Sequence, residues 1–65
     1  FTGPEVLPIL HEALRSEDRI IRANAALGCG AVGAPESAEP LLAALKDADP
    51  EVRRCAAEGL GRAMV

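Results

Sequence analysis

The residues that could carry out catalysis or hold a metal ion are few and lie far apart in the sequence. They are one histidine with the glutamate beside it, two serines and two cysteines, namely His11, Glu12, Ser16, Ser37, Cys29 and Cys55. A serine or cysteine nucleophile needs a histidine base and a group that orients this base, and a metal site needs about three or four converging ligands. A single histidine does not meet these needs, so we expect a surface histidine, no enzyme, and no metal or other cofactor.

Glycines recur in pairs, and their context argues against a phosphate-binding loop. Gly28 and Gly30, and again Gly59 and Gly61, follow no predicted strand and do not open a helix, which a dinucleotide-binding loop requires. Together with nearby alanines they leave little side-chain bulk on the segments that carry them. We therefore expect these segments to approach one another closely when they pack.

These glycines belong to a pattern that occurs twice, at a shift of 31 residues. The first copy repeats in the second copy at matched positions, for example Asp18, Arg22, Ala25, Ala26, Gly28 and Gly30 as Asp49, Arg53, Ala56, Ala57, Gly59 and Gly61. A period in this range is typical of stacked structural repeats. We predict one fragment over residues 1–65, with repeats at 4–33 and 35–64.

Each repeat reads as two helices joined by a short acidic turn. Apolar residues with helical spacing predict helices ending near residue 15, over 19–32, over 35–46, and from residue 50 onward. Asp18 and Asp49 are suited to begin the second helices as N-caps, and Gly33 to end one. The predicted fold is all-α, with four helices in two antiparallel hairpins and an inner stripe of Leu10, Leu14, Ile21, Ala25, Leu41, Leu45, Val52, Ala56 and Leu60.

Size and composition set further expectations. The chain has 65 residues, 49% of them hydrophobic, with Phe1 as its one aromatic residue. A core of this size is marginally stable by itself, so we expect flanking repeats or self-association. The two cysteines fall at non-equivalent positions and suit reduced apolar fillers, and neither a signal peptide nor a membrane span is evident. We expect a cytoplasmic location and no membrane contact.

The second copy resembles a known family through an acidic turn, an Ala-Ala pair, a Gly-Leu-Gly close and the run Asp49-Pro50-Glu51-Val52-Arg53. It is similar to the short bacterial and archaeal HEAT-like repeat, often labelled with the phycobilisome lyase. The first copy departs where Arg19 replaces the proline and Asn24 stands in an apolar position. The resemblance implies a right-handed α-solenoid whose second helices line the concave face, used as a protein-binding scaffold. The alternative it leaves open is a repeat segment of a larger enzyme such as a bilin lyase.

Two enzyme groups with HEAT-like folds give further comparisons. Deoxyhypusine hydroxylases hold a di-iron site with several His-Glu pairs, whereas this sequence has one such pair, His11 with Glu12. Alkylpurine DNA glycosylases bind DNA on a basic concave face. This chain is acidic, with a net charge of -3, and has no Trp or Tyr, so nucleic acid is an unlikely partner.

An aspartate precedes an arginine by four residues in both repeats, a spacing that brings two side chains together on one side of a helix. The pairs are Asp18 with Arg22 and Asp49 with Arg53. One interpretation is a row of arginines for a carboxylate or phosphate partner. The interpretation we favour is a structural ladder that ties successive repeats together.

Basic residues gather on the second helices, while the first helices and the turns are acidic. If the solenoid geometry holds, the concave side is mildly basic. We therefore predict an acidic peptide or protein segment as partner, contacted by Arg54, Glu58 and Arg62, with Arg19 at the same surface. The alternative is that these charges only keep a surface solvated.

Overall fold

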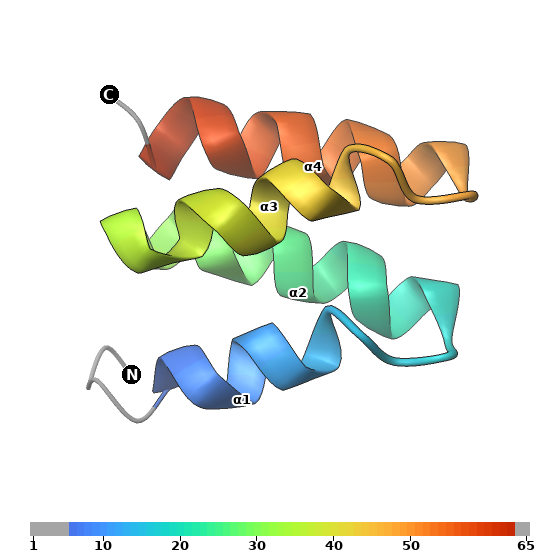
Figure 1. Ribbon diagram of the computed structural model, residues 1–65, viewed down its shortest axis with the longest axis horizontal. Coiled ribbons are helices and arrows are strands. Elements are labelled where there is room, and N and C mark those ends of the chain that lie inside the picture. The colour runs from blue at the N-terminus through green and yellow to red at the C-terminus, as the bar shows by residue number, and fades with distance from the viewer. Residues whose placement is uncertain (1–5, 64–65) are drawn as a thin grey trace.

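The computed structural model describes residues 6–63, and it is built of α-helices with one short 3₁₀ helix. Figure 1 shows the helices in chain order, and their bounds are α1 Val6–Ala13, α2 Arg19–Val32, η1 Pro35–Ser37, α3 Ala38–Ala44 and α4 Pro50–Ala63. Within these residues there is no strand. The predicted all-α fold with four helices is confirmed.

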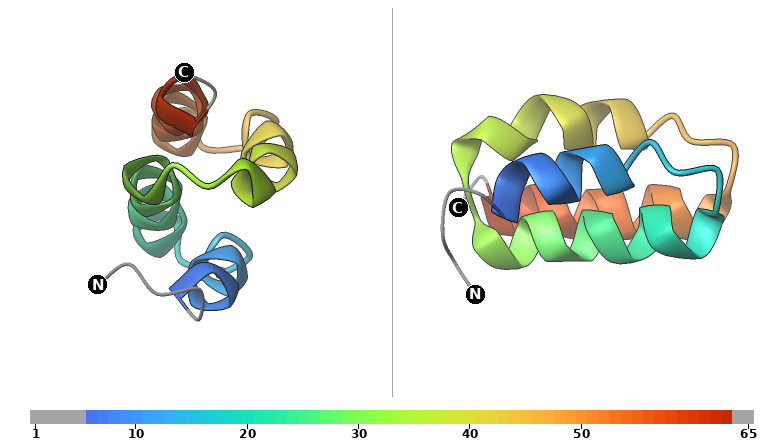
Figure 2. Two further views of the ribbon diagram at one scale, coloured as in Figure 1. Left: turned by 90° about the vertical axis from the view of Figure 1, so that its left-hand side faces the viewer. Right: turned by 90° about the horizontal axis from the view of Figure 1, so that it is seen from below.

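The helices form two layers (Figure 2). The first helices of the two hairpins, α1 and α3, lie in one layer, and the second helices, α2 and α4, lie side by side in the other. The most extensive contact between elements is that of α2 with α4. Two hairpins are therefore stacked in parallel, mainly through their second helices.

Aspartates and a glycine set the ends of the second helices as predicted. The side chain of Asp18 accepts a hydrogen bond from the backbone N–H of Ile20 at 2.8 Å, and Asp49 accepts one from Glu51 at 2.8 Å. Both carboxylates satisfy amides that have no partner within the helix and face the positive end of its dipole. Gly33 ends α2 in the left-handed region, with φ of 70°, which glycine adopts without steric cost.

A proline lies near the start of each first helix, and α3 is shorter than predicted. Pro8 is the third residue of α1 and Pro40 the third residue of α3. A proline has no N–H to donate to the preceding turn, so it is tolerated only in the first turn of a helix. Residues 35–37 accordingly form a 3₁₀ turn, and α3 covers Ala38–Ala44 instead of the predicted 35–46. The predicted beginning of the first helix lies outside the described residues.

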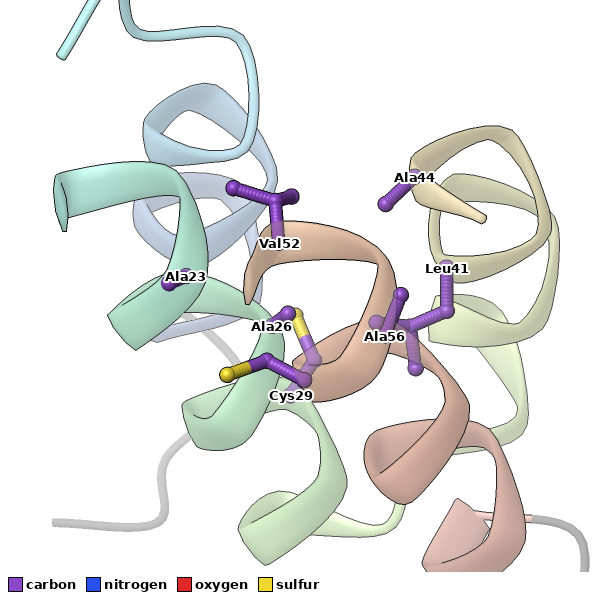
Figure 3. Packing of buried hydrophobic residues seen from close by; sticks show 8 residues of the cluster. Ala23, Ala26, Cys29, Leu41, Ala44, Val52 and Ala56 are labelled. Carbon is purple, nitrogen blue, oxygen red and sulfur yellow. The ribbon is translucent and has the colours of Figure 1, made fainter. Parts of the chain in front are cut away.

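The core lies between the two layers and is built of small side chains (Figure 3). Its fully buried members come from α2, α3 and α4, and half-buried leucines pack around them. The buried hydrophobic residues are Ala23, Ala25, Ala26, Cys29, Leu41, Ala44, Val52, Cys55 and Ala56. Four residues of the predicted inner stripe are among them, and Leu10, Leu14, Leu45 and Leu60 pack against this cluster.

Ile21 was predicted to lie in the buried inner stripe, and this prediction is wrong. Its side chain is 46% exposed, whereas Val52, at the matched position of the second repeat, is fully buried. Val52 lies on the side of α4 that packs against α2 of the preceding repeat. Ile21 faces the same way from the first repeat, and no described residue precedes that repeat to cover it.

The two second helices touch at their backbones. A Cβ added to Gly30 would lie 2.6 Å from the Cα of Gly59, and one added to Gly59 would lie 2.6 Å from the carbonyl oxygen of Ala26. Neither distance leaves room for a side chain. The predicted close approach of the glycine-bearing helices is confirmed at this pair, and it explains why glycine stands there despite its cost of about 1 kcal/mol in a helix.

Candidate functional site

The exposed side of α2 and α4 carries a shallow hollow of about 190 Å³, which we call the α2–α4 groove. Its lining combines apolar and charged side chains, and consists of Arg19, Ile20, Ala23, Asn24, Leu27, Asp49, Glu51 and Cys55. Ile20 is 62% exposed at this place. An aliphatic side chain so exposed beside a hollow offers an apolar contact, with polar groups at the rim to orient what binds there.

Arg54 is held by two carboxylates of its own helix, one of which, Glu51, lines the α2–α4 groove. Its guanidinium donates to Glu51 and, at 3.0 Å, to Glu58. The hydrogen bond and charge of Arg54 lower the pKa of Glu51, and the same contacts raise the pKa of Arg54. The structure thus brings together two of the predicted contact residues, Arg54 and Glu58. It also shows that the positive charge of Arg54 is compensated by the carboxylates of Glu51 and Glu58.

Arg19, the predicted contact residue on α2, is linked to the second repeat. It donates to the carboxylate of Asp49 at 3.3 Å, while its own side chain is 69% exposed. Burial opposes ionisation of Asp49, yet the backbone N–H groups of Glu51 and Val52 and the charge of Arg19 together lower its pKa. Arg19 and Asp49 therefore form the charged end of the groove. Arg62, the fourth predicted contact residue, is exposed in the last turn of α4.

Arg22 corrects the predicted ladder. Its carboxylate partner is Asp47 of the second repeat, reached from Nε at 2.8 Å and from Nη2 at 3.2 Å, and not Asp18 of its own helix. Asp18 is engaged in capping α2, and the bend of the turn brings Asp47 to the side of Arg22. The backbone N–H of Asp49 and the Arg22 guanidinium lower the pKa of Asp47 against the opposing effect of burial.

The arginines of the two repeats hold their own turns in the same way. Arg22 donates from Nη1 to the carbonyl of Ser16 at 2.7 Å, and Arg53 donates from Nη1 to the carbonyl of Asp47 at 2.7 Å. Both carbonyls lie six residues before the arginine. The difference is that Arg22 also binds a carboxylate across the repeat boundary, whereas Arg53 is exposed and its second contact is the carbonyl of Ala48. The predicted pairing of Asp49 with Arg53 is replaced by these carbonyl contacts.

His11 is half-buried, not the surface residue that we expected. Its Nε2 lies 2.9 Å from the Oγ of Ser37, which is fully buried in η1. This pair joins α1 to the second repeat. Because the two residues are 26 positions apart, no local spacing rule predicts their contact. Because Ser37 is inaccessible to solvent, we interpret the pair as a structural contact.

The two cysteines are enclosed. Cys29 and Cys55 are free and buried, and burial raises the pKa of both thiols, which disfavours the nucleophilic thiolate. Among the described residues, no group of three or more His, Cys, Asp or Glu side chains is placed to hold a metal ion.

Two stacked helical hairpins, joined through their second helices and carrying in each copy the same aspartate cap and the same arginine contact to a turn carbonyl, define a segment of an α-solenoid repeat protein. The family model for HEAT repeats matches residues 3–64. The chain belongs to the HEAT-repeat family. HEAT repeats generally mediate protein–protein interactions, and the family is typically non-catalytic. No curated protein matches the chain in sequence. In residues 6–63, none of the helices has the length and apolar character needed to cross a membrane.

Proposed function

We propose that this chain is a non-catalytic scaffold that binds a segment of a partner protein across α2 and α4. The observation that carries the proposal is Ile20, which is 62% exposed at the α2–α4 groove. Family membership supports protein binding in general, and the groove supports this place for it. The two reduced, buried cysteines favour a cytoplasmic location.

The partner that suits this surface combines an aliphatic side chain with an acidic one. The aliphatic side chain would fill the groove beside Ile20 and Leu27. The acidic side chain would be received at the rim by Arg19 or Arg54, because a guanidinium has five N–H donors and Arg54 uses three of them within α4. A purely acidic peptide is less suitable than we expected from the sequence, since Glu51 and Glu58 flank Arg54.

The test uses peptides selected from a random library on the immobilised chain. A selected peptide should bind Ile20→Ser about tenfold more weakly than the unchanged chain, because an apolar contact at the groove is lost. Ile21→Ser is the matched control, since Ile21 is the neighbouring residue, is also exposed, and does not line the groove. Equal binding to both variants, or a selection that yields no peptide, would contradict the proposal.

The same measurement tests the rim. Arg19 lines the groove and is 69% exposed, so an acidic residue should be enriched in the selected peptides. Arg19→Gln should then weaken the binding of peptides that carry this acidic residue more than the binding of peptides that lack it. Added bilin serves as a further probe, because binding of bilin in place of peptides would favour the alternative of a bilin lyase segment.

A further inference from the structure

The exposed large hydrophobic residues of this chain collect mainly at its two ends. Ile9 is 68% exposed, Ile21 46% and Leu42 52%, and none of the three lines the α2–α4 groove. Leaving such large apolar side chains in water is unfavourable, and burying them against another element is favourable. The internal repeat shows what each would contact.

The contact between α2 and α4 provides the template. On α2 it uses small residues, including Ala23, Ala26 and Gly30, and on α4 it uses Val52, Cys55 and Gly59. The shift of 31 residues maps the α4 set onto a face of α2, which we call the leading face and define by Ile21, Asn24 and Gly28. It maps the α2 set onto a face of α4, which we call the trailing face and define by Arg54, Ala57 and Gly61.

The two faces are largely exposed in the described part of the chain. Ile21, Asn24, Ala57 and Gly61 are all exposed, while Gly28 is half-buried beside Leu10 of α1, as Gly59 lies beside Leu41 of α3. A Cβ added to Gly61 would have nothing within 4 Å, whereas one added to Gly30, at the matched position, would strike the backbone of Gly59. Gly61 thus destabilises its helix as any interior glycine does, but lacks the close backbone contact that requires a glycine at Gly30.

The first helices extend the same correspondence. His11 contacts Ser37 of the following repeat, and the shift of 31 residues replaces this pair by Leu42 and Val6. Ile9 takes the place of Pro40, which lines a hollow of about 440 Å³ between α1 and α3. Leu42 therefore belongs to the trailing end, and Ile9 to the leading end, of the stack.

Charge also favours the contact of one end with the other. Arg53, beside the trailing face, is exposed and retains donors beyond its two carbonyl contacts. The turn at the leading end carries Glu17 and Asp18, both exposed. Arg54 occupies the position on α4 that Ala23 occupies on α2. Its guanidinium is bound to Glu51 and Glu58, so its aliphatic stem is available to pack on Ile21 of a neighbouring copy.

We propose that a second copy of this chain docks head to tail, with the leading face of one copy on the trailing face of the other, Gly28 opposite Gly61 and Leu42 opposite Val6. The contact continues the α2–α4 interface in the same register. It is weaker than the internal interface, because Asn24 replaces Cys55 and Ser16 replaces Asp47, the carboxylate that Arg22 binds. A contact of two different faces leaves one of each free, so the association is open-ended.

Sedimentation equilibrium of the chain across a wide range of concentrations tests this proposal. We expect reversible association that grows beyond a dimer. Gly61→Ala should weaken it by at least about tenfold, because the added Cβ would meet the backbone of Gly28, as it would at Gly30 and Gly59 within the chain. Ile21→Ser should also weaken association, whereas Ile20→Ser, which changes the groove, should not.

Ser16→Asp supplies a test in the opposite direction. An aspartate at this position matches Asp47, whose Oδ1 accepts from Asp49 N–H as Ser16 Oγ accepts from Asp18 N–H. It would offer Arg53 of the neighbouring copy a carboxylate, and should strengthen association by about tenfold. The proposal is overturned by a monomer at all concentrations, by a symmetric dimer that grows no further, or by equal effects of Ile20→Ser and Ile21→Ser. If the chain associates head to tail but binds no peptide at the α2–α4 groove, only the proposed function is rejected.

Discussion

The interior and the trailing side of this chain are built on the same positions of a repeat and differ in what surrounds them. Gly30 faces the backbone of Gly59, whereas a side chain at Gly61 would meet nothing within 4 Å among the described residues. Arg22 binds the carboxylate of the next repeat, whereas the contacts of Arg53 among residues 6–63 are to carbonyls of its own turn. In a repeat protein, therefore, the energetic role of a residue depends on its neighbour as much as on its type.

The largest expected effect comes from filling the closest contact. Gly30→Ala should destabilise the fold by about 3 kcal/mol, because the new Cβ would lie 2.6 Å from backbone that cannot rotate away. Urea unfolding followed by circular dichroism measures this change. A loss smaller than that of an ordinary surface substitution would show that α2 and α4 are not in backbone contact.

The next largest effect is a difference in stability between substitutions at two matched positions, one buried and one exposed. Val52→Ala should cost about 2 kcal/mol, since Val52 is fully buried, while Ile21→Ala should change stability by less than about 0.5 kcal/mol. Both are measured by urea unfolding at low protein concentration, where association does not contribute. Equal costs would indicate that Ile21 is covered in solution.

The ion pair between the repeats gives a smaller effect that depends on pH. Asp47→Asn should cost about 1.5 kcal/mol at neutral pH through weaker bonding to Arg22. The pKa of Asp47 is lowered in the folded state, so its contribution is complete above about pH 5 and is lost as pH falls below the unfolded value near 3.9. Unfolding free energies of the two proteins should therefore converge in acid. If the difference between the two unfolding free energies stayed constant with pH, the ion pair would not be its source.

Gly61→Ala should have the smallest effect on folding, and with the opposite sign to Gly30→Ala. It should stabilise the isolated chain by about 1 kcal/mol, because alanine is the better helix former and the space around Gly61 is open. Thermal unfolding at low concentration measures the gain. Destabilisation would show that Gly61 already has a close neighbour.

The sequence predicts the fold and the capped ends of the second helices well, because those depend on local rules. Asp18, Asp49 and Gly33 act on amides and carbonyls within a few residues, and the spacing of apolar residues follows the helix period. Ile21 shows the limit of this reasoning. An apolar stripe reveals which side of a helix seeks burial but not whether another element is present to bury it.

The contacts between repeats could not be predicted from spacing along one helix. Arg22 was assigned to Asp18 because the two are four residues apart, yet the turn brings Asp47 closer. His11 and Ser37 meet across 26 residues, a relation that depends on how far one hairpin is displaced along the other. Arg19, Arg54 and Glu58 were predicted as contact residues from the sequence, but the ion pairs that compensate them and the exposure of Ile20 at the groove were not.

The backbone contact of Gly30 with Gly59 has a mechanical consequence. Interfaces made by side chains yield to bending, because rotamers can change and take up the displacement. Two backbones in direct contact have no such freedom, so the distance between α2 and α4 is fixed near that point. A solenoid assembled from this unit would flex at its first helices, where α1 and α3 are separated by a hollow, and would behave as a hinge of fixed pivot along α2 and α4.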